Sequence, residues 1–331
     1  MMSAVELDLD QAAAAVREAP ELALACHQTP DGDALGSVLA LLELCRAHGK
    51  RAVASWSEPF QVAPHYRFLP GLDLATKPAD FPSTPDVMMT FDCGSIDRLG
   101  QLADAARAAR TLVVVDHHAT NDRYGTVNLV DAGAAATTVL VRRLAARLGW
   151  ELTRDAAMCL YTGLVTDTGR FQYSNTTPEV FALAEELASF DLPIATMTRQ
   201  LFEEHRFDYL KLVAQCMARA ELDRDLHLVA SWVTEDDLHA HGCCIEETEG
   251  LIDLVRRAAE AEVACVLKET PEGIRVSLRA ASAADVSKVA ARFGGGGHRY
   301  AAGFVAPGTI AEVLAAIRAA LADDPPPAPF A

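Results

Sequence analysis

Acidic and histidine side chains follow four apolar stretches of the sequence, each at the point where the stretch ends. These residues are His27, Asp31 and Asp33, then Asp92, then Asp116, His117 and His118, and finally Asp167. Carboxylates gathered in one place raise one another's pKa, and divalent cations remove that penalty. Carboxylate oxygens together with imidazole nitrogens suit Mn²⁺ or a similar first-row ion. Two such ions can share a water and activate it for attack on phosphorus, with Asp92 as the candidate bridging carboxylate.

Each residue of this set also has an ordinary structural interpretation. An aspartate after a strand is usually a helix cap or a turn former, and Asp33 taken alone fits a cap before Ala-Leu-Gly-Ser. Asp-His-His taken alone could be a surface turn. The joint occurrence at four separate element ends favours one shared site instead.

The elements that must position these residues alternate between strands and helices in the first half of the chain. The expected strands are Glu21–His27, Arg51–Trp56, Asp86–Cys93, Arg110–His118 and Gly125–Asp131. The expected helices are Ala34–His48, Ala135–Leu148, Asp155–Thr166 and Pro178–Ser189. This order predicts an α/β fold with an N-terminal, doubly wound, mostly parallel sheet. The carboxyl ends of its strands would line one crevice, which brings distant residues together.

The second half predicts a smaller C-terminal α/β domain, with the active-site cleft between the two domains. Its expected strands are Leu226–Trp232, Val263–Glu269 and Gly273–Ala280, with a helix at Ile252–Ala261. We expect a catalytic, metal-binding domain at 1–188, a linker at 189–205, a substrate-binding domain at 206–322 and a disordered proline-rich tail at 323–331. Residues 197–212 read as one continuous helix.

The sequence predicts a tetraglycine loop at 294–297, directly before His298. Glycines let backbone N–H groups approach an anion closely because no Cβ stands in the way. Arg279 and His298 could add charged hydrogen bonds to a phosphate. A glycine run alone can equally be a flexible turn.

These segments resemble the DHH phosphoesterase family, which is named for its Asp-His-His motif. The family pattern His-x-x-x-Asp-x-Asp-x-x-Gly-Ser is matched throughout residues 27–37. Asp92 in FDCGSIDRLG, Asp116-His117-His118 and Asp167 in TDTGRF match the other three motifs in order. GGGGHRYAAGF at 294–304 resembles the signature of the DHHA1 domain, and Arg279 matches the arginine that precedes it.

The resemblance implies a role for each matching residue. His27 and Asp31 would hold one cation, Asp33, His117 and Asp167 would hold the other, and Asp92 would bridge them. His118 would face the substrate, and Asp116 would orient a neighbouring histidine. The residues expected to contact substrate are Arg98, Arg279, Gly295, Gly296, Gly297 and His298.

Within the family, the two-domain layout resembles the bifunctional oligoribonuclease (nanoRNase) and pAp phosphatase group. That group implies hydrolysis of short oligonucleotides to 5′-mononucleotides and removal of the 3′-phosphate of 3′-phosphoadenosine 5′-phosphate (pAp). It also implies two divalent cations, Mn²⁺ before Mg²⁺ or Co²⁺, and a homodimer. The alternatives are a cyclic-dinucleotide or pGpG phosphodiesterase, an exopolyphosphatase, and a non-hydrolytic nucleotide-binding regulator.

Composition limits the partners. The chain has 29 Lys and Arg against 46 Asp and Glu, a formal net charge of −17, which argues against binding of long nucleic acid. No apolar run approaches the roughly 18 residues that would span a membrane. The acidic N-terminus does not read as a secretory signal, and the 8 scattered cysteines fit free thiols in a reducing compartment. We therefore expect a cytoplasmic enzyme of small nucleotidic substrates, without a membrane partner.

Overall fold

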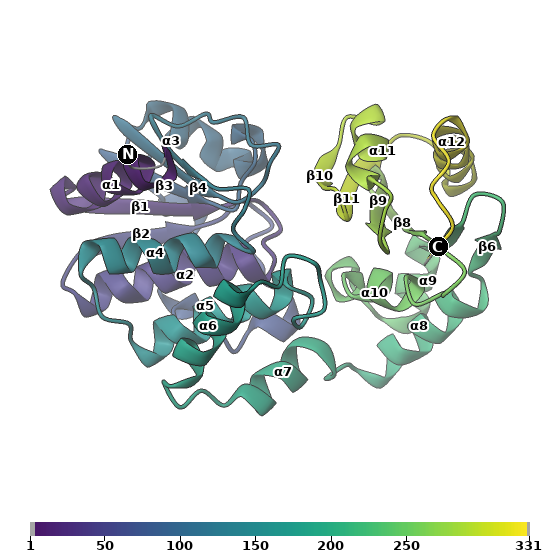
Figure 1. Cartoon of the computed structure of the whole chain (residues 1–331), viewed down its shortest axis with the longest axis horizontal. Helices are drawn as coiled ribbons and strands as arrows, with labels where there is room; N and C mark the ends of the chain where they lie inside the picture. Colours follow the sequence, from purple (N-terminus) through teal and green to yellow (C-terminus); the bar gives the residue numbers. More distant parts are fainter. Residues whose placement is uncertain (1–3, 330–331) are drawn as a thin grey trace. The chain divides into compact units, whose positions relative to one another are not determined.

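The computed structural model describes residues 4–329 and divides into two compact units, with the boundary between Leu201 and Phe202 (Figure 1). The boundary lies in helix α7 (Ile194–Phe202), which occupies part of the expected linker. The prediction of one continuous helix across 197–212 is wrong, because α7 ends at Phe202 and α8 (Phe207–Ala218) begins separately.

Unit 1, residues up to Leu201, is built on a five-stranded parallel sheet in the order β2-β1-β3-β4-β5. Its strands are β1 (Glu21–Cys26), β2 (Arg51–Ser55), β3 (Val87–Phe91), β4 (Thr111–Asp116) and β5 (Val127–Val130). The central strand β3 is buried along its whole length, as expected of a strand covered by helices on both faces. The predicted parallel α/β sheet is thereby confirmed.

The helices of unit 1 include two that pack unusually closely, α2 and α5. The α-helices are α1 (Ala4–Glu18), α2 (Gly32–Ala47), α3 (Ala103–Ala108), α4 (Thr137–Leu148), α5 (Arg154–Asp167) and α6 (Pro178–Ala188), with short 3₁₀ segments between several elements. A Cβ on Gly36 of α2 would lie 2.5 Å from the carbonyl oxygen of Cys159 in α5. Gly36 therefore lets the two helices that carry Asp33 and Asp167 approach each other.

Unit 2, from Phe202 onward, contains a six-stranded mixed sheet in the order β10-β11-β9-β8-β7-β6. Its strands are β6 (Glu221–Asp223), β7 (Leu228–Val233), β8 (Val263–Thr270), β9 (Gly273–Ala280), β10 (Gly296–His298) and β11 (Ala301–Ala306). Its other helices are α9 (Glu235–His241), α10 (Leu251–Val255), α11 (Val286–Arg292) and α12 (Ile310–Asp323). Across residues 4–329, no helix is both long and apolar enough to cross a membrane.

Two sequence expectations for unit 2 are wrong. The helix predicted at Ile252–Ala261 ends at Val255. The tetraglycine segment is not wholly a loop, because Gly296 and Gly297 belong to β10, which pairs with β11 at the edge of the sheet.

Both faces of the unit 2 sheet carry helices, but unequally. Helices α11 and α12 pack on one face around Phe304 and Ile317. On the other face, α8 and α10 cover β7 and β8 around Leu212, Leu251 and Val266. The side chains of β9 and β11 on this second face stay partly exposed.

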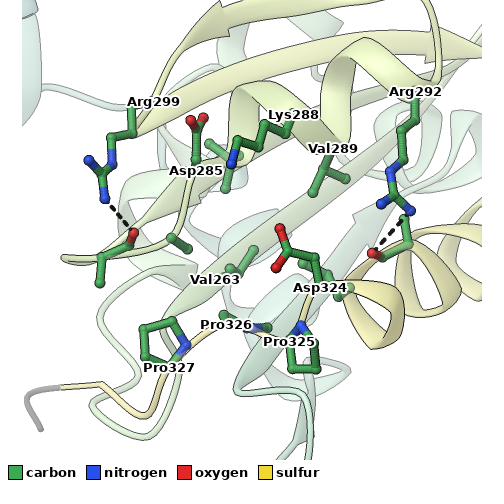
Figure 2. A pocket seen from close by; sticks show the side chains of 15 residues that line it. Val263, Asp285, Lys288, Val289, Arg292, Arg299, Asp324, Pro325, Pro326 and Pro327 are labelled. Carbon is green, nitrogen blue, oxygen red and sulfur yellow. Dashed lines mark hydrogen bonds between the residues drawn. The ribbon is translucent and has the colours of Figure 1, made fainter.

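The proline-rich tail was predicted to be disordered over 323–331. Asp323 ends α12, residues 324–329 have no regular secondary structure, and Phe330 and Ala331 lie outside the described residues. Pro325–Pro327 line a cavity of about 300 Å³ beside α11 (Figure 2). Arg292 and Arg299, which also line it, each donate a hydrogen bond to a backbone carbonyl. None of the residues expected to contact substrate lines this cavity.

Candidate active site

Asp92 occupies the centre of the acidic and histidine cluster of unit 1. It directly follows β3, is 2% exposed, and has a φ of 55°, which is uncommon for a residue other than glycine. Its Oδ2 lies 3.7 Å from Nε2 of His27, which follows β1. Its Oδ1 lies 3.6 Å from Nε2 of His117, which follows β4. Asp92 thus presents one carboxylate oxygen to each of two histidines from neighbouring strands.

On the first side of Asp92, a ligand atom each from His27, Asp31 and Asp92 lie within 4.8 Å of one another. Nδ1 of His27 is 2.8 Å from the carbonyl oxygen of Gln28, which can only accept, so Nδ1 carries the hydrogen and Nε2 faces the carboxylates. Asp31 caps α2 through Oδ1, which accepts the N–H groups of Asp33 and Ala34. Its Oδ2 lies 3.7 Å from Nε2 of His27.

On the second side, Asp33, Asp92 and His117 form a similar group. Nε2 of His117 lies 3.7 Å from Oδ2 of Asp33 and 3.4 Å from Oδ2 of Asp167, the last residue of α5. Nδ1 of His117 is 3.2 Å from the carbonyl oxygen of Ala134, which again turns Nε2 toward the carboxylates. The four sequence segments therefore meet in unit 1, as predicted from the strand order.

Asp33 is held from outside its own helix. Its Oδ2 accepts the N–H of Thr137 at 2.6 Å, and its Oδ1 accepts the N–H of Thr138 at 3.0 Å, both at the N-terminus of α4. A helix N-terminus favours a negative charge. Asp31, rather than Asp33, caps α2.

Thr137 is a site residue that the sequence analysis missed. It is fully buried, and its hydroxyl donates to Oδ1 of Asp92 at 3.0 Å, so Thr137 links the carboxylates of Asp33 and Asp92. A Thr-Thr pair at the start of a helix identifies a site residue only once the helix is known to point at the site.

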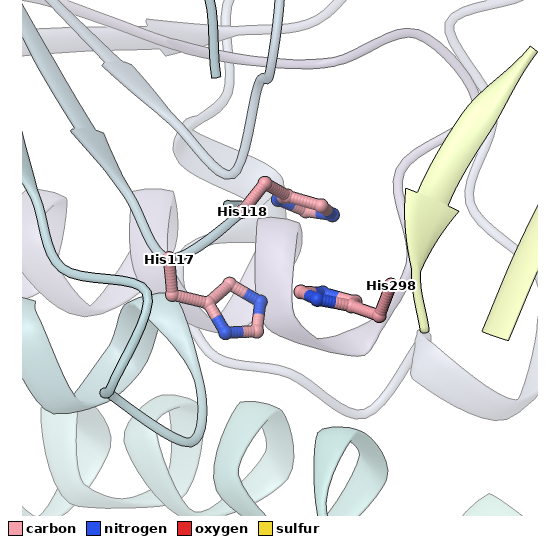
Figure 3. A group of neighbouring side chains, drawn as sticks. All are labelled: His117, His118 and His298. Atoms are coloured by element: carbon pink, nitrogen blue, oxygen red, sulfur yellow. The ribbon is translucent and has the colours of Figure 1, made fainter. Parts of the chain in front are cut away.

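Asp116 positions the next two residues of the chain. Its Oδ1 accepts the N–H of His117 at 2.8 Å and lies 2.7 Å from Nδ1 of His118. Its Oδ2 accepts a hydrogen bond from Asn121 at 2.5 Å. The rings of His117 and His118 lie edge to face, with centroids 4.9 Å apart and planes at 67° (Figure 3). His118 therefore has its Nδ1 fixed by Asp116 and its Nε2 on the opposite side of the ring.

Two histidines of the cluster, His27 and His117, have a raised pKa when only protein groups surround them. Burial lowers the pKa of His27, but hydrogen bonds with Asp31 and Asp92 outweigh it and raise that pKa to about 9. Burial is likewise outweighed at His117, where the neighbouring carboxylates, Asp167 foremost, raise the pKa to about 10. The cluster thus attracts positive charge.

Two of the carboxylates, Asp33 and Asp167, show the same shortage of positive charge. At Asp92, by contrast, burial is outweighed by the hydrogen bond with His27 and the charges of His118 and His117, which hold its pKa below the usual value. Burial and the neighbouring carboxylates raise the pKa of Asp33 well above its usual value. Burial raises the pKa of Asp167 to about 6, although His117 opposes the rise. Divalent cations would supply charge in place of these protons, and the mixed oxygen and nitrogen donors fit a first-row ion.

The other predicted substrate contacts belong partly to unit 1 and partly to unit 2. Arg98 is exposed in the 3₁₀ segment Ile96–Leu102 of unit 1, and its carbonyl oxygen accepts the N–H of Gln28, beside His27. Arg279 in β9 and His298, the last residue of β10 (Figure 3), belong to unit 2. Both pair in register with Ala301 of β11, so they mark one end of the β10-β11-β9 region.

The three glycines predicted to face a phosphate differ from one another. A Cβ on Gly295 would lie 2.2 Å from the carbonyl oxygen of Gly303. Gly297 has a φ of 138°, and its Cβ would lie 2.5 Å from the carbonyl oxygen of Ala301. A Cβ on Gly296 would meet no described atom within 4 Å. The sheet itself therefore requires Gly295 and Gly297, while the space above Gly296 is open.

Two family models match the chain. The DHH family, N-terminal domain, matches residues 21–164, and the DHHA1 domain matches residues 240–323. The bifunctional oligoribonuclease and PAP phosphatase NrnA of Thermus thermophilus is 31% identical over 85% of this chain and 82% of that protein. The protein of the same name from Bacillus subtilis is 26% identical over 84% of this chain and 86% of its own length.

Solved structures show the same fold. An exopolyphosphatase-related protein from Bacteroides fragilis has a TM-score of 0.87 at 23% identity and covers 97% of this chain and 98% of its own. RecJ from Thermus thermophilus in complex with Mn²⁺ has a TM-score of 0.55 at 15% identity and covers 97% of this chain and 55% of its own. Together with the family matches and the identity to full-length relatives, these findings show that the chain belongs to the DHH family of phosphoesterases, which are metal-dependent hydrolases.

Proposed function

We propose that this phosphoesterase hydrolyses short oligonucleotides to 5′-mononucleotides and removes the 3′-phosphate of pAp, using two divalent cations. The observation that carries the proposal is the position of Asp92, whose two oxygens face His27 and His117 from opposite sides. The names of the relatives from Thermus thermophilus and Bacillus subtilis support the substrate class.

The ligand assignment follows the two groups around Asp92. His27 and Asp31 would hold one cation, Asp33, His117 and Asp167 the other, and Asp92 would be shared. When bound, the cation pair would lower the pKa of a shared water and neutralise charge on the phosphate oxygens. The mixed oxygen and nitrogen donors favour Mn²⁺ over Mg²⁺.

His118 is the candidate general acid. Burial lowers its pKa, but the hydrogen bond to Asp116 and the charge of Asp92 outweigh that effect, so the pKa is raised. A protonated imidazole can donate to the oxygen of the leaving group. Asp116 keeps the proton of Nδ1 in place, which leaves Nε2 to face the substrate.

Positive and neutral donors on both units would hold the substrate phosphates. Arg98 is the candidate in unit 1, and Arg279, His298 and Gly296 are candidates in unit 2. Nε of Arg279 is buried and has no hydrogen-bond partner among the described residues, which suits a donor that awaits an anion.

The net charge of −17 supports a short substrate. A long nucleic acid gains affinity from many phosphate contacts to a basic surface, and an acidic chain repels the phosphates beyond the site. The homodimer that the family resemblance implies stays a prediction.

A hydrolysis profile tests the proposal. The substrates are pAp, linear and cyclic dinucleotides, polyphosphate, and RNA and DNA of two to twenty residues, each with Mn²⁺ and with a chelator. We expect turnover of pAp and of RNA of two to four residues, a fall of at least about tenfold toward twenty residues, and none with chelator.

Equal rates on two-residue and twenty-residue RNA would contradict the length dependence. Preferred hydrolysis of polyphosphate or a cyclic dinucleotide would replace the proposed substrate. Turnover in the presence of the chelator would contradict the proposed role of the cations in hydrolysis.

A further inference from the structure

One face of the unit 2 sheet carries an unusual set of side chains at β9–β11, where α8 and α10 cover the sheet less completely than they cover β7 and β8. Residues that pair across antiparallel strands share a face, so the register defines the set. This β9–β11 face consists of Arg275, Ser277 and Arg279 of β9, Ala301, Gly303 and Val305 of β11, and Gly296 and His298 of β10. All eight are partly or fully exposed.

The charge of this face is opposite to that of the chain. The three strands β9, β10 and β11 contain two arginines and one histidine and no Asp or Glu, in a chain with a formal net charge of −17. Such a separation of sign concentrates a positive potential on one small surface.

Arg275 has no hydrogen-bond or ion-pair partner among the described residues, although most arginines of this chain have one, as Arg318 does with Glu221. It pairs in register with Lys268 of β8, which is buried and donates to the carbonyl oxygen of Thr248. Burial is the main cause that lowers the pKa of Lys268. The charges of Arg275 and Arg279 lower it further, while the charge of Glu249 opposes the shift. Cations are thus gathered here without a carboxylate that pairs with Arg275.

Arg275 and Arg279 lie four residues apart on one strand, about 13 Å from Cα to Cα at 3.3 Å per residue. Strand side chains stand roughly perpendicular to the sheet, so the two guanidinium groups address different points along a ligand. Ser277 lies between them on the same face and offers a hydroxyl.

We propose that the β9–β11 face is a track for the sugar-phosphate backbone of a bound oligonucleotide, on which Arg275 holds a phosphate one or two nucleotides beyond the one held at Arg279. The proposal rests on the proposed function and extends it from a single phosphate to a chain of two to four residues. Gly303 and Ala301 keep the middle of the track flat. Val305, 49% exposed and paired with Arg275, offers an apolar contact for a sugar or base.

The track predicts that a short oligonucleotide gains affinity from each added residue and that a long one does not. A mononucleotide such as pAp would reach only Arg279 and its neighbours. A trinucleotide would also reach Arg275. Beyond Gly273 the strand ends, and so does the row of cations.

The test compares Arg275→Gln with the wild-type full-length chain on pAp and on a trinucleotide. Loss of one charged hydrogen bond predicts a fall of about tenfold in kcat/KM for the trinucleotide and less than twofold for pAp. The slope of log kcat/KM against log salt for the trinucleotide should become shallower by about 0.7, the value of one phosphate contact to a single strand.

The control is Arg224→Gln, which removes an exposed arginine near β6, at the opposite edge of the same sheet. It should leave both substrates unchanged. An equal loss on pAp and trinucleotide, or the same loss in Arg224→Gln, would overturn the track, because the effect would then be structural or a matter of net charge.

Binding without hydrolysis separates this proposal from the proposed function. A fluorescein-labelled RNA trinucleotide is titrated with each protein in EDTA, and anisotropy gives the dissociation constant. About tenfold weaker binding in Arg275→Gln supports the track even if the wild type hydrolyses neither substrate. Unchanged binding overturns it even if the wild type is an active oligoribonuclease.

Discussion

Nδ1 of His118 lies 2.7 Å from Oδ1 of Asp116, and the same oxygen accepts the backbone N–H of His117. One fully buried carboxylate therefore fixes both the path of the chain and the orientation of the imidazole. Since Asp116 also accepts from Asn121, its two oxygens are occupied by neighbours in its own loop. This arrangement makes Asp116 a positioning residue, and His118 the group it positions.

Asp116→Asn should lower kcat about 10- to 100-fold. The amide keeps the size of the side chain but loses the negative charge that orients His118 and stabilises its protonated form. The carboxylate raises the pKa of His118. Without it the imidazole loses its proton at lower pH, so the alkaline limb of the pH–kcat profile should move to lower pH.

Asp122→Asn, an exposed change in the same loop, is the control and should keep wild-type kinetics. Mn²⁺ content, measured after gel filtration, should stay equal in all three proteins. A loss of bound metal in Asp116→Asn would show that Asp116 acts on the cations and not through His118.

The sequence predicted that the metal-ligand candidates converge, because their positions depend on topology alone. Once β1, β3 and β4 are parallel neighbours, residues at their carboxyl ends must converge, and His27, Asp92 and His117 do. Thr137 could not be predicted in this way. Its contact with Asp92 depends on where α4 begins relative to the sheet, which is a matter of tertiary packing.

The misplaced helix ends have a similar cause. Residues 203–206 continue a helical pattern, but all four are exposed, so packing does not hold them in a helix. The side chain of Arg206 instead donates to the carbonyl oxygen of Gly242 and pairs with Glu247, which fixes where α8 begins. Local propensity carries no information about such distant partners.

Asp92→Asn should abolish most of the stabilisation that Mn²⁺ gives to unit 1. At Mn²⁺ about 100 times its dissociation constant, binding adds about 2.7 kcal/mol, or roughly 5 to 10 °C in Tm for a unit of this size. Asparagine tolerates the left-handed backbone of residue 92 and can still accept from Thr137, so the variant should fold. Differential scanning fluorimetry with Mn²⁺ and with EDTA measures the shift.

Asp73→Asn, an exposed change in unit 1, provides the matched control and should keep the full Mn²⁺-dependent rise. In EDTA, the Tm of Asp92→Asn should lie below that of wild type, because the variant loses the carboxylate whose pKa His27, His118 and His117 hold below its usual value despite burial. An undiminished Mn²⁺ response in Asp92→Asn would rule out a shared ligand at this position.

Gly296→Ala should weaken substrate binding and leave stability nearly unchanged. The added Cβ meets no described atom within 4 Å, so the fold has room for it, but it fills the space into which a phosphate would come. We expect KM for pAp to rise about tenfold, with a change in unfolding free energy below about 1 kcal/mol.

Gly297→Ala gives the opposite pattern and serves as the comparison. Its Cβ would lie 2.5 Å from the carbonyl oxygen of Ala301, and its φ of 138° is unfavourable for alanine, so unit 2 should lose roughly 1–3 kcal/mol of stability. If Gly296→Ala retains the wild-type KM, the open space at Gly296 is not where the substrate binds.

Lys268 predicts a pH dependence of stability that belongs to unit 2 alone. Burial, with Arg275 and Arg279 nearby, lowers its pKa from 10.5 to about 8, although Glu249 opposes the shift. Between those two values the unfolded chain holds a proton that the folded chain has released, so stability from this group rises with pH. The contribution of Lys268 to the free energy of unfolding is fully present above pH 10.5 and is lost as the pH falls through 8. The two limits differ by on the order of 3 kcal/mol.

Lys268→Met should remove this rise, because methionine has nothing to titrate and fills a similar volume. Urea unfolding at several pH values from 7 to 10 is followed through Trp232 of unit 2, with Trp56 and Trp150 replaced by phenylalanine in both proteins. The difference in unfolding free energy, wild type minus variant, should grow as pH increases. Lys288→Met, at an exposed lysine of the same unit, should behave as wild type. A difference that stays constant across this range would mean that Lys268 keeps its proton in the folded chain, supported by Thr248 and the nearby glutamates.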